Sequence, residues 1–129
     1  MESIRLKRAY EPPEPQDGSR FLVDRLWPRG LKKDSLPLKG CIKEAAPSSG
    51  LRKWFNHDPA KWNDFCQRYS QELEHHPQVL EPIKEALKKG AVTLIYSAKD
   101  QEHNNAVALA VFLRGHIFPH EATRRGGER

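Results

Sequence analysis

Residues 20–30 of the chain read Arg-Phe-Leu-Val-Asp-Arg-Leu-Trp-Pro-Arg-Gly, an apolar run that gives way to a charged segment. The run Phe21–Val23 is apolar at every position, which is typical of an interior strand covered on both faces. The run stops at Asp24, and Pro28 and Gly30 then favour a turn. The stretch therefore predicts a buried strand followed by a stiff, charged loop.

A second buried strand is predicted at residues 91–97, Ala-Val-Thr-Leu-Ile-Tyr-Ser, because most of them are β-branched, aromatic or apolar. Residues 4–9 alternate apolar and basic side chains, as a half-exposed strand does. Residues 105–113 are almost wholly apolar, so a helix there must be largely buried. Residues 99–104 form a short polar connection between the second strand and this helix.

Three more helices are predicted in the middle of the chain. Leu51–Phe55 is a short helix with Ser48 or Ser49 as its N-cap. A second helix begins at Asp58-Pro59, a capping residue followed by proline, and a third follows His75-His76-Pro77. The second helix carries an apolar stripe that we expect in the core, made of Trp62, Phe65, Cys66, Tyr69 and Leu73.

Alternating strands and helices predict an α/β fold, a single small domain over residues 1–119. We expect an open, mainly parallel sheet with helices on both faces. Residues 41–46 fit either a short strand or a turn of helix, and residues 117–118 are expected to add a last short strand. Residues 120–129 have no periodic apolar pattern and are predicted to be a disordered tail.

The composition limits the classes of protein to which the chain can belong. No apolar run approaches the ~18 residues that span a bilayer, and the N-terminus lacks the apolar region of a signal peptide. We therefore expect a cytoplasmic protein with no membrane partner, in which Cys41 and Cys66 are free thiols. The net charge of +5 favours anionic partners, although a solvated basic surface explains it equally well. The histidines form no recognised metal pattern, so no metal is expected.

The polar residues that follow the two buried strands are the candidate site. The carboxyl ends of parallel strands lie at one edge of a sheet, where ligands of such folds bind. Arginine and lysine there can hold a phosphate or carboxylate, an acid or histidine can transfer protons, and a helix start offers N–H donors. The candidate acid/base residues are Asp24 and His103, and the candidate ligand-binding residues are Arg25, Trp27, Arg29, Lys99, Asp100 and Asn104.

Each of these residues also has a structural interpretation. Asp24 and Arg25 can form an ion pair that orders the loop, Asp100 can cap the following helix, and Trp27 can pack in the core. The standard nucleotide-binding loops GxxxxGK[ST] and GxGxxG are absent, as is the GxSxG elbow of hydrolases. The sequence therefore indicates no particular cofactor, and it leaves open whether the protein is an enzyme.

Four stretches of the chain together resemble the YeaO-like family of small bacterial proteins, a domain of unknown function. They are LVDRLWPRG (22–30), APSSGLRKWFNHDPAKWNDF (46–65), RYSQEL (68–73) and VTLIYSAKDQEHNNAVAL (92–109). The resemblance implies a cytosolic, single-domain α/β protein and adds a third wall to the site, with Arg52, Trp54 and His57. A longer sister branch has a cysteine near the position of Ser97, so thiol chemistry is not expected at this loop.

Three functions are compatible with these features of the chain. The first is a protein that binds or acts on a small, phosphate-bearing anion in a crevice at the strand ends. The alternative is a nucleic-acid-binding module that uses a basic face, to which Trp27–Arg29 and Leu51–Phe55 would contribute. The third is a small interaction protein without a ligand of its own.

Overall fold

The computed structural model describes residues 4–117 of the chain. Within this range four strands form one sheet in the order β1-β4-β2-β3, and each neighbouring pair is parallel. The strands are β1 (Ile4–Arg8), β2 (Ser19–Leu22), β3 (Gly40–Cys41) and β4 (Val92–Tyr96). The predicted α/β domain with an open, parallel sheet is confirmed. The predicted domain end at residue 119 and the tail 120–129 lie outside the described residues.

The two strands that the sequence predicts as buried are the interior strands of the sheet. β4 lies between β1 and β2, and β2 lies between β4 and β3. Phe21 is in register with Leu94, and the pairing continues past β2 because the Val23 N–H donates to the Ile95 carbonyl at 3.1 Å. All residues of Phe21–Val23 and Val92–Tyr96 are buried, as their apolar runs predict.

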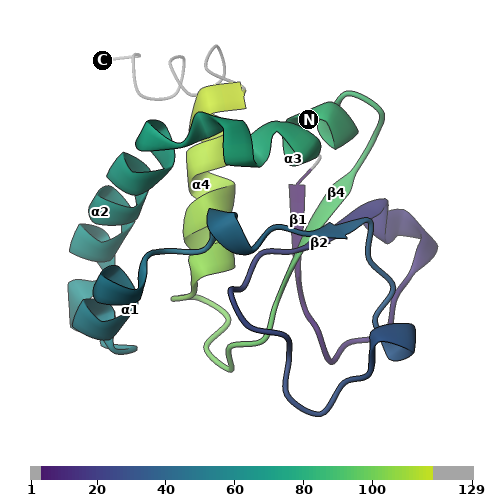
Figure 1. Cartoon of the computed structure of the whole chain (residues 1–129), viewed down its shortest axis with the longest axis horizontal. Coiled ribbons are helices and arrows are strands. Elements are labelled where there is room, and N and C mark those ends of the chain that lie inside the picture. Colours follow the sequence, from purple (N-terminus) through teal and green to yellow (C-terminus); the bar gives the residue numbers. More distant parts are fainter. Residues whose placement is uncertain (1–3, 118–129) are drawn as a thin grey trace.

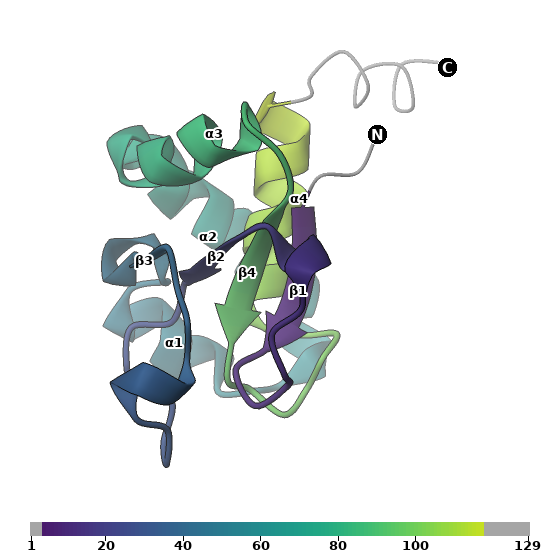
Figure 2. The ribbon, with the colours of Figure 1, turned by 90° about the vertical axis from the view of Figure 1, so that its right-hand side faces the viewer.

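The α-helices pack on one face of this sheet and enclose the main core. They are α1 (Ser49–Phe55), α2 (Trp62–His75), α3 (Glu81–Leu87) and α4 (Asn105–Ile117). Figure 1 and Figure 2 both show α2 and α4 on the same side of the strands. Phe65, Tyr69 and Leu73 of α2 are buried there, as predicted, whereas Trp62 is only partly buried.

The second face of the sheet is covered mainly by extended chain. Its apolar cluster consists of Leu22 and Ile95 from the strands with Ala9 and Leu36, and Trp27 packs against them. The helical elements near this face are two single 3-10 turns, η1 (Pro15–Asp17) and η2 (Lys33–Ser35). Helices are expected on both faces of the sheet, and in the structure the α-helices lie on one face and 3-10 turns lie on the other.

Two local predictions are corrected. α4 continues through Gly115 to Ile117, so the short strand expected at residues 117–118 is wrong at Ile117, and Phe118 lies outside the described residues. The preference of glycine against helix is only about 1 kcal/mol, and packing of an apolar helix against a core outweighs it. Residues 41–46 contain both of the expected alternatives, since β3 ends at Cys41 and a 3-10 turn, η3 (Lys43–Ala45), follows.

Candidate functional site

A pocket of about 570 Å³ lies at the carboxyl ends of β2 and β4. Its walls come from the loop after β2, from α1 and the turn that follows it, and from the connection between β4 and α4. A pocket of this volume is within the range of small-molecule sites. The predicted site residues that line it are Asp24, Arg25, Trp27, Arg29, Arg52, His57, His103 and Asn104. The structure thus brings these eight residues together, and their roles stay predictions.

Asp24 links the ends of the two interior strands. Its Oδ2 accepts hydrogen bonds from the Ser97 backbone N–H at 2.9 Å and from the Ser97 hydroxyl at 2.8 Å. The structural interpretation of Asp24 names Arg25 as its partner, but the partner is Ser97, which follows β4. One carboxylate oxygen is therefore engaged in holding the pocket together, and only Oδ1 remains for a ligand.

Asn105 makes a second link between the same strand and the helix that begins at the pocket. Its side-chain amide donates to the Val23 carbonyl at 3.0 Å, and it lines the pocket. Asn104 is predicted from the sequence, whereas its neighbour Asn105 is not. A polar residue directly before the apolar run of residues 106–113 is the signal that could have found it.

Asn104 and Asp100 order the connection that leads to α4. Asn104 Oδ1 accepts from the Val107 N–H at 3.0 Å, which caps the helix. Asp100 Oδ1 accepts from the N–H groups of Glu102 and His103 at 2.9 and 3.0 Å. These N–H groups and the His103 ring lower the pKa of Asp100. Asp100 is not among the lining residues, and in the structure it orders this loop. Its predicted ligand contact stays a prediction.

His103 is held in one orientation at the edge of the pocket. Its Nδ1 lies 3.0 Å from Asp100 Oδ2, and its ring meets Trp62 edge to face at 5.3 Å between centroids. Because ionised Asp100 accepts the proton on Nδ1, Nε2 is the nitrogen left for a ligand or a proton. His103 is therefore the candidate acid/base residue with the clearer geometry.

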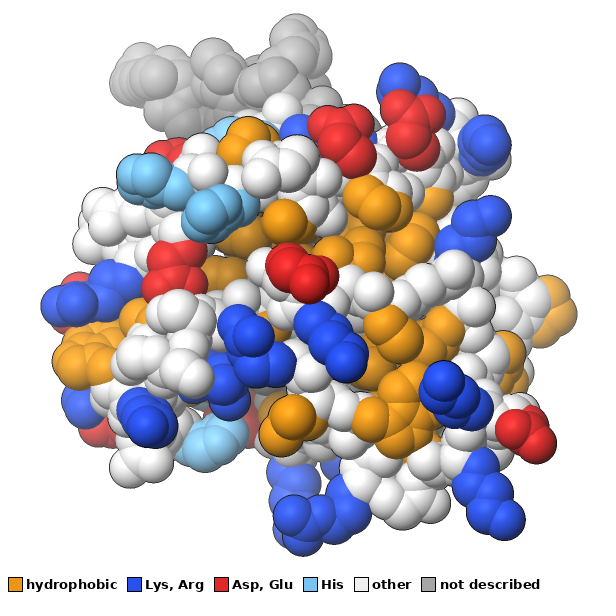
Figure 3. Space-filling view, in the orientation of Figure 1, with side chains coloured by type: hydrophobic (Ala, Val, Ile, Leu, Met, Phe, Trp, Pro, Cys, Tyr) orange, Lys and Arg blue, Asp and Glu red, His pale blue; other side chains and the backbone are white. Residues whose placement is uncertain are grey.

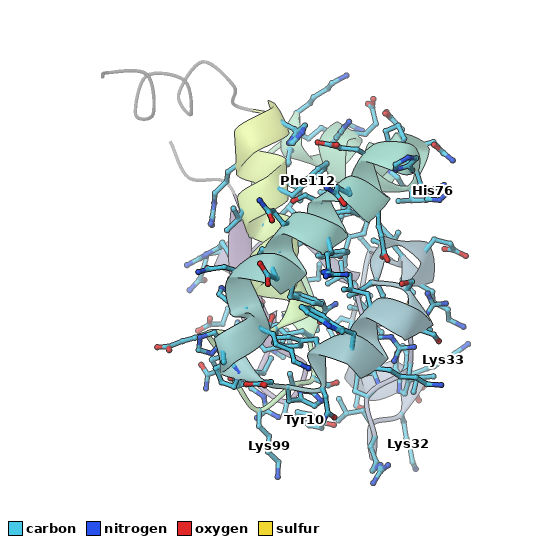
Figure 4. The ribbon with its side chains drawn as sticks, turned by 90° about the vertical axis from the view of Figure 1, so that its left-hand side faces the viewer. Tyr10, Lys32, Lys33, His76, Lys99 and Phe112 are labelled. Carbon is cyan, nitrogen blue, oxygen red and sulfur yellow. The ribbon has the colours of Figure 1, made fainter. Side chains whose placement is uncertain are left out.

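Two of the predicted residues point away from the pocket. Lys99 is exposed and projects from the molecule, as Figure 4 shows. Trp54 faces α2 and the turn before it. The Arg68 guanidinium of α2 lies 4.4 Å from its ring centroid, and the ammonium of Lys61, just before α2, lies 5.1 Å from it. The side of α1 on which a residue falls decides this, since Arg52 of the same helix does line the pocket.

Trp27 lies between the pocket and the core. Its ring lines the pocket but also packs against the second core cluster. Its indole N–H donates to the Leu31 carbonyl at 2.6 Å, which closes the loop after β2. Trp27 is therefore fixed in place by the fold, and its stacking on a ligand stays a prediction.

The loop that carries Arg29 is fixed from the other side by Tyr10. The Tyr10 hydroxyl donates to the Arg29 carbonyl at 2.9 Å, and the Arg8 guanidinium lies 5.0 Å from the Tyr10 ring centroid. Arg8 in turn donates to the carbonyls of Ser97 and Ala98 at 3.0 and 2.9 Å. The sequence does not indicate Arg8 and Tyr10 as site residues, because they lie far along the chain from the loops that they join.

Most cationic groups around the pocket have no partner in the described part of the chain. Within residues 4–117 the side chains of Arg25, Arg29 and Lys53 make no hydrogen bond or ion pair, and Arg52 reaches only Ser49 Oγ, at 3.4 Å. The carboxylate of Asp24 is the acidic group that lines the pocket. Figure 3 shows Lys and Arg side chains gathered between α1 and the loop after β2, with a histidine below them. The pocket therefore has an excess of positive charge.

The backbone beside these cations is held in a strained conformation. Asn56 and His57 both line the pocket and have positive φ angles of 48° and 55°. Left-handed backbone at non-glycine residues costs on the order of 1–3 kcal/mol each and concentrates at ligand sites. Asn56 donates its N–H to the Arg52 carbonyl at 3.0 Å, so it ends α1 at the pocket wall.

Together, the fold and the pocket define a small parallel α/β domain with a positively charged cavity at the strand carboxyl ends. The chain belongs to the DUF488-N3i family, whose model, described as "Inactive DUF488-N3 subclade", matches residues 3–126. Among the described residues, no helix is long and apolar enough to cross a membrane, and no group of three or more His, Cys, Asp or Glu could hold a metal.

Curated relatives of the chain match over almost their full length. It is 45% identical over 112 residues to the uncharacterized protein YeaO of Escherichia coli, which covers 87% of this chain and 97% of that protein. It is 36% identical over 112 residues to the uncharacterized protein Rv3073c of Mycobacterium tuberculosis, with 87% and 94% covered. The predicted membership of the YeaO-like family is confirmed. No solved structure matches the chain significantly.

Proposed function

We propose that the pocket binds a small, phosphate-bearing anion. The observation that carries the proposal is the charge of the lining: Arg25, Arg29, Arg52 and Lys53 face a single carboxylate, Asp24, which already accepts two hydrogen bonds from Ser97. Guanidinium groups match the geometry of phosphate oxygens and bind them in pairs of hydrogen bonds. Cations that are not paired within the protein keep this capacity for a ligand.

Rigidity supports the same proposal. Tyr10 fixes the carbonyl of Arg29, and Pro28 is buried beside it. Asn56 and His57 keep a conformation that few non-glycine residues adopt. A backbone that is already ordered loses little entropy when a ligand binds, and this loss is one of the main costs of binding.

The site favours binding over turnover. Asp24 holds Ser97, and Ser97 stands near the position where a sister branch of the superfamily has its cysteine, so this loop offers no thiol nucleophile. His103 stays the candidate proton donor or acceptor, and the word "Inactive" in the family description agrees with a non-catalytic role. The ligand would be a cytoplasmic small molecule, in line with the predicted location of the protein.

Calorimetric titration of inorganic phosphate into the wild type and the Arg29→Ala and Arg52→Ala variants tests this proposal. We expect each variant to bind at least about tenfold more weakly, since a charge-assisted hydrogen bond contributes about 1.5–3 kcal/mol. Lys89→Ala is the matched control, because Lys89 is exposed, follows α3 and lies outside the pocket. Equal binding by all four proteins, or none, would refute the proposal.

A second titration, with a single-stranded oligonucleotide in place of phosphate, tests the nucleic-acid alternative. A module that contacts many phosphates loses affinity steeply as salt increases. Two results together would favour that alternative. The oligonucleotide would bind more tightly than phosphate, and its affinity would depend steeply on salt. Lys32→Ala and Lys33→Ala would reduce this salt dependence.

A further inference from the structure

A second pocket of about 660 Å³ adjoins the arginine-lined one. It lies between α2, the 3-10 turn η5 (Pro77–Leu80) and the turn before α1. Arg25 and Ala46 line both pockets, so the two cavities meet at these residues. In Figure 4, Tyr10, which lines the first pocket, lies toward one end of the molecule, and His76, which lines the second, lies toward the other. The two pockets are therefore neighbours that share Arg25 and Ala46 at their junction.

The floor of the second pocket is apolar. Tyr69 and Leu73 of α2 are almost fully buried beneath it, and Val79 is partly buried. The Tyr69 hydroxyl donates to the Ala45 carbonyl, and burial raises its pKa far above the usual range. The Tyr69 hydroxyl is therefore not available to a ligand, and the floor suits an apolar or aromatic group.

The rim of the second pocket still has polar groups that are not used by the fold. Glu72 is engaged by the Ser48 N–H at 2.9 Å and by the Ser48 hydroxyl at 2.5 Å. In contrast, the side chains of Glu44, His76 and Gln78 line the pocket and make no hydrogen bond to the described residues. A ring that carries donors or acceptors at its edge would find partners there.

Arg25 is the link between the two cavities. Its side chain is exposed and, within residues 4–117, makes no ion pair or hydrogen bond. A guanidinium at the junction can contact an anion on one side and stack on a flat ring on the other. Few side chains suit both parts of such a ligand.

We infer that the ligand is a phosphate monoester with an aromatic ring, in which the phosphate occupies the arginine-lined pocket and the ring occupies the second one. This inference rests on the proposed anion site and names the class of its ligand. Phosphate oxygens bind Arg29 and Arg52, Arg25 covers the ester linkage, and the ring lies on Tyr69, Leu73 and Val79. The polar rim then selects among rings by the groups at their edges.

Titration with methyl phosphate and phenyl phosphate tests the inference, because the two esters differ in the ring. We expect phenyl phosphate to bind about tenfold or more tightly than methyl phosphate, as burial of an aromatic ring predicts. Gln78→Trp narrows the second pocket from its exposed rim and should abolish this preference while leaving methyl phosphate binding unchanged. Gln67→Trp, on an exposed position of α2 outside the pockets, is the matched control and should change neither affinity.

The outcomes separate this inference from the proposed function. Equal affinities for the two esters, or an unchanged preference in Gln78→Trp, would overturn the ring site and leave the anion site standing. Failure of both esters to bind would refute both. Binding of phenyl phosphate that Arg29→Ala does not weaken would also overturn the inference, since the phosphate would then lie elsewhere.

Discussion

Two groups of charged side chains in this protein differ in whether the fold pairs them. On the second face of the sheet, the Asp17 carboxylate lies 2.9 Å from Lys7 Nζ and 2.5 Å from Arg20 Nη1, and its side chain is 3% exposed. At the strand ends, Arg25 and Arg29 are exposed, and neither pairs with any side chain in the described range. The charges of the first group are paired with one another, although Arg20 Nη2 is buried without a hydrogen-bond partner among the described residues. The cations of the second group are left unpaired.

The difference shows which charges can serve a ligand. Asp17, at the end of η1, is linked to three strands. Lys7 belongs to β1 and Arg20 to β2, and the Thr93 hydroxyl of β4 donates to the Asp17 carbonyl at 2.7 Å. Arg20 Nε donates to the Pro37 carbonyl at 2.9 Å. Removing Asp17 would leave the Arg20 side chain, which is 7% exposed, without its acidic partner. Arg25 and Arg29 at the pocket form no such ion pair within the described residues, and for this reason we assign ligand binding to them.

Among the variants that test this comparison, Asp17→Ala should cause the largest loss in the free energy of unfolding. It leaves Lys7 and Arg20 without their buried partner, and such losses cost about 3–5 kcal/mol. The measurement is the free energy of unfolding in urea. Asp34→Ala, at an exposed carboxylate in η2, is the control and should stay within about 0.5 kcal/mol. A change under about 1 kcal/mol for Asp17→Ala would show that the cluster does not stabilise the fold.

The same cluster predicts how stability depends on pH. Burial alone would raise the pKa of Asp17, but hydrogen bonds from Lys7, the Glu14 N–H and Arg20 lower it below its ordinary value of 3.8. Because the folded state binds this proton less readily than the unfolded one, the stabilisation is complete above the ordinary pKa and is lost as pH falls through the folded pKa. The melting-temperature difference between wild type and Asp17→Asn should therefore shrink below about pH 4. A constant difference down to strong acid would contradict the pairing.

Asp24 shares a property with each of the two groups, because it accepts hydrogen bonds from Ser97 and also lines the pocket. Variants of Asp24 therefore test both its contribution to stability and its effect on binding. Asp24→Ala leaves two Ser97 donors without their acceptor and should destabilise the protein by about 1–3 kcal/mol. Asp24→Asn keeps an acceptor oxygen and should lose less stability. Because it also removes the negative charge from the pocket, it should bind phosphate more tightly than the wild type. If phosphate binding instead weakened in Asp24→Asn, Asp24 would contact the ligand directly.

The smallest effect on stability is expected for the pocket cations. Arg29→Ala should change the free energy of unfolding by no more than about 0.5 kcal/mol, as is usual for exposed side chains. Its phosphate affinity should fall nevertheless. A stability loss comparable to that of Asp17→Ala would mean that Arg29 supports the fold and is not free for a ligand.

The sequence predicts the parts of the fold that depend on apolar runs. Phe21–Val23 and Val92–Tyr96 are recognisable as interior strands because both of their faces must be covered. The Asp17 cluster is not predictable in this way, because Asp17 belongs to a proline-rich segment without periodicity. Only the tertiary fold brings that segment against Lys7 and Arg20. Buried charge of this kind leaves no mark in a hydrophobic pattern.

The candidate site is predictable to the level of loops but not of side chains. The carboxyl ends of parallel strands must share one edge, so Asp24 and His103 are expected near each other, and they line one pocket. Whether a side chain enters that pocket depends on packing between helices, which turns Trp54 toward α2. The second pocket also escapes prediction, since it combines α2 with turns that are distant in sequence.

A titration of inorganic phosphate followed by amide resonances of ¹⁵N-labelled protein tests most directly whether the pocket cations form an anion site. We predict saturable shifts at Arg29, Asn56, His57 and Asn105, which surround the arginine-lined pocket. We predict no shifts at Lys7, Asp17 and Arg20, whose charges are already paired. Shifts confined to residues outside the pocket, or none that saturate, would contradict the claim that these cations form an anion site.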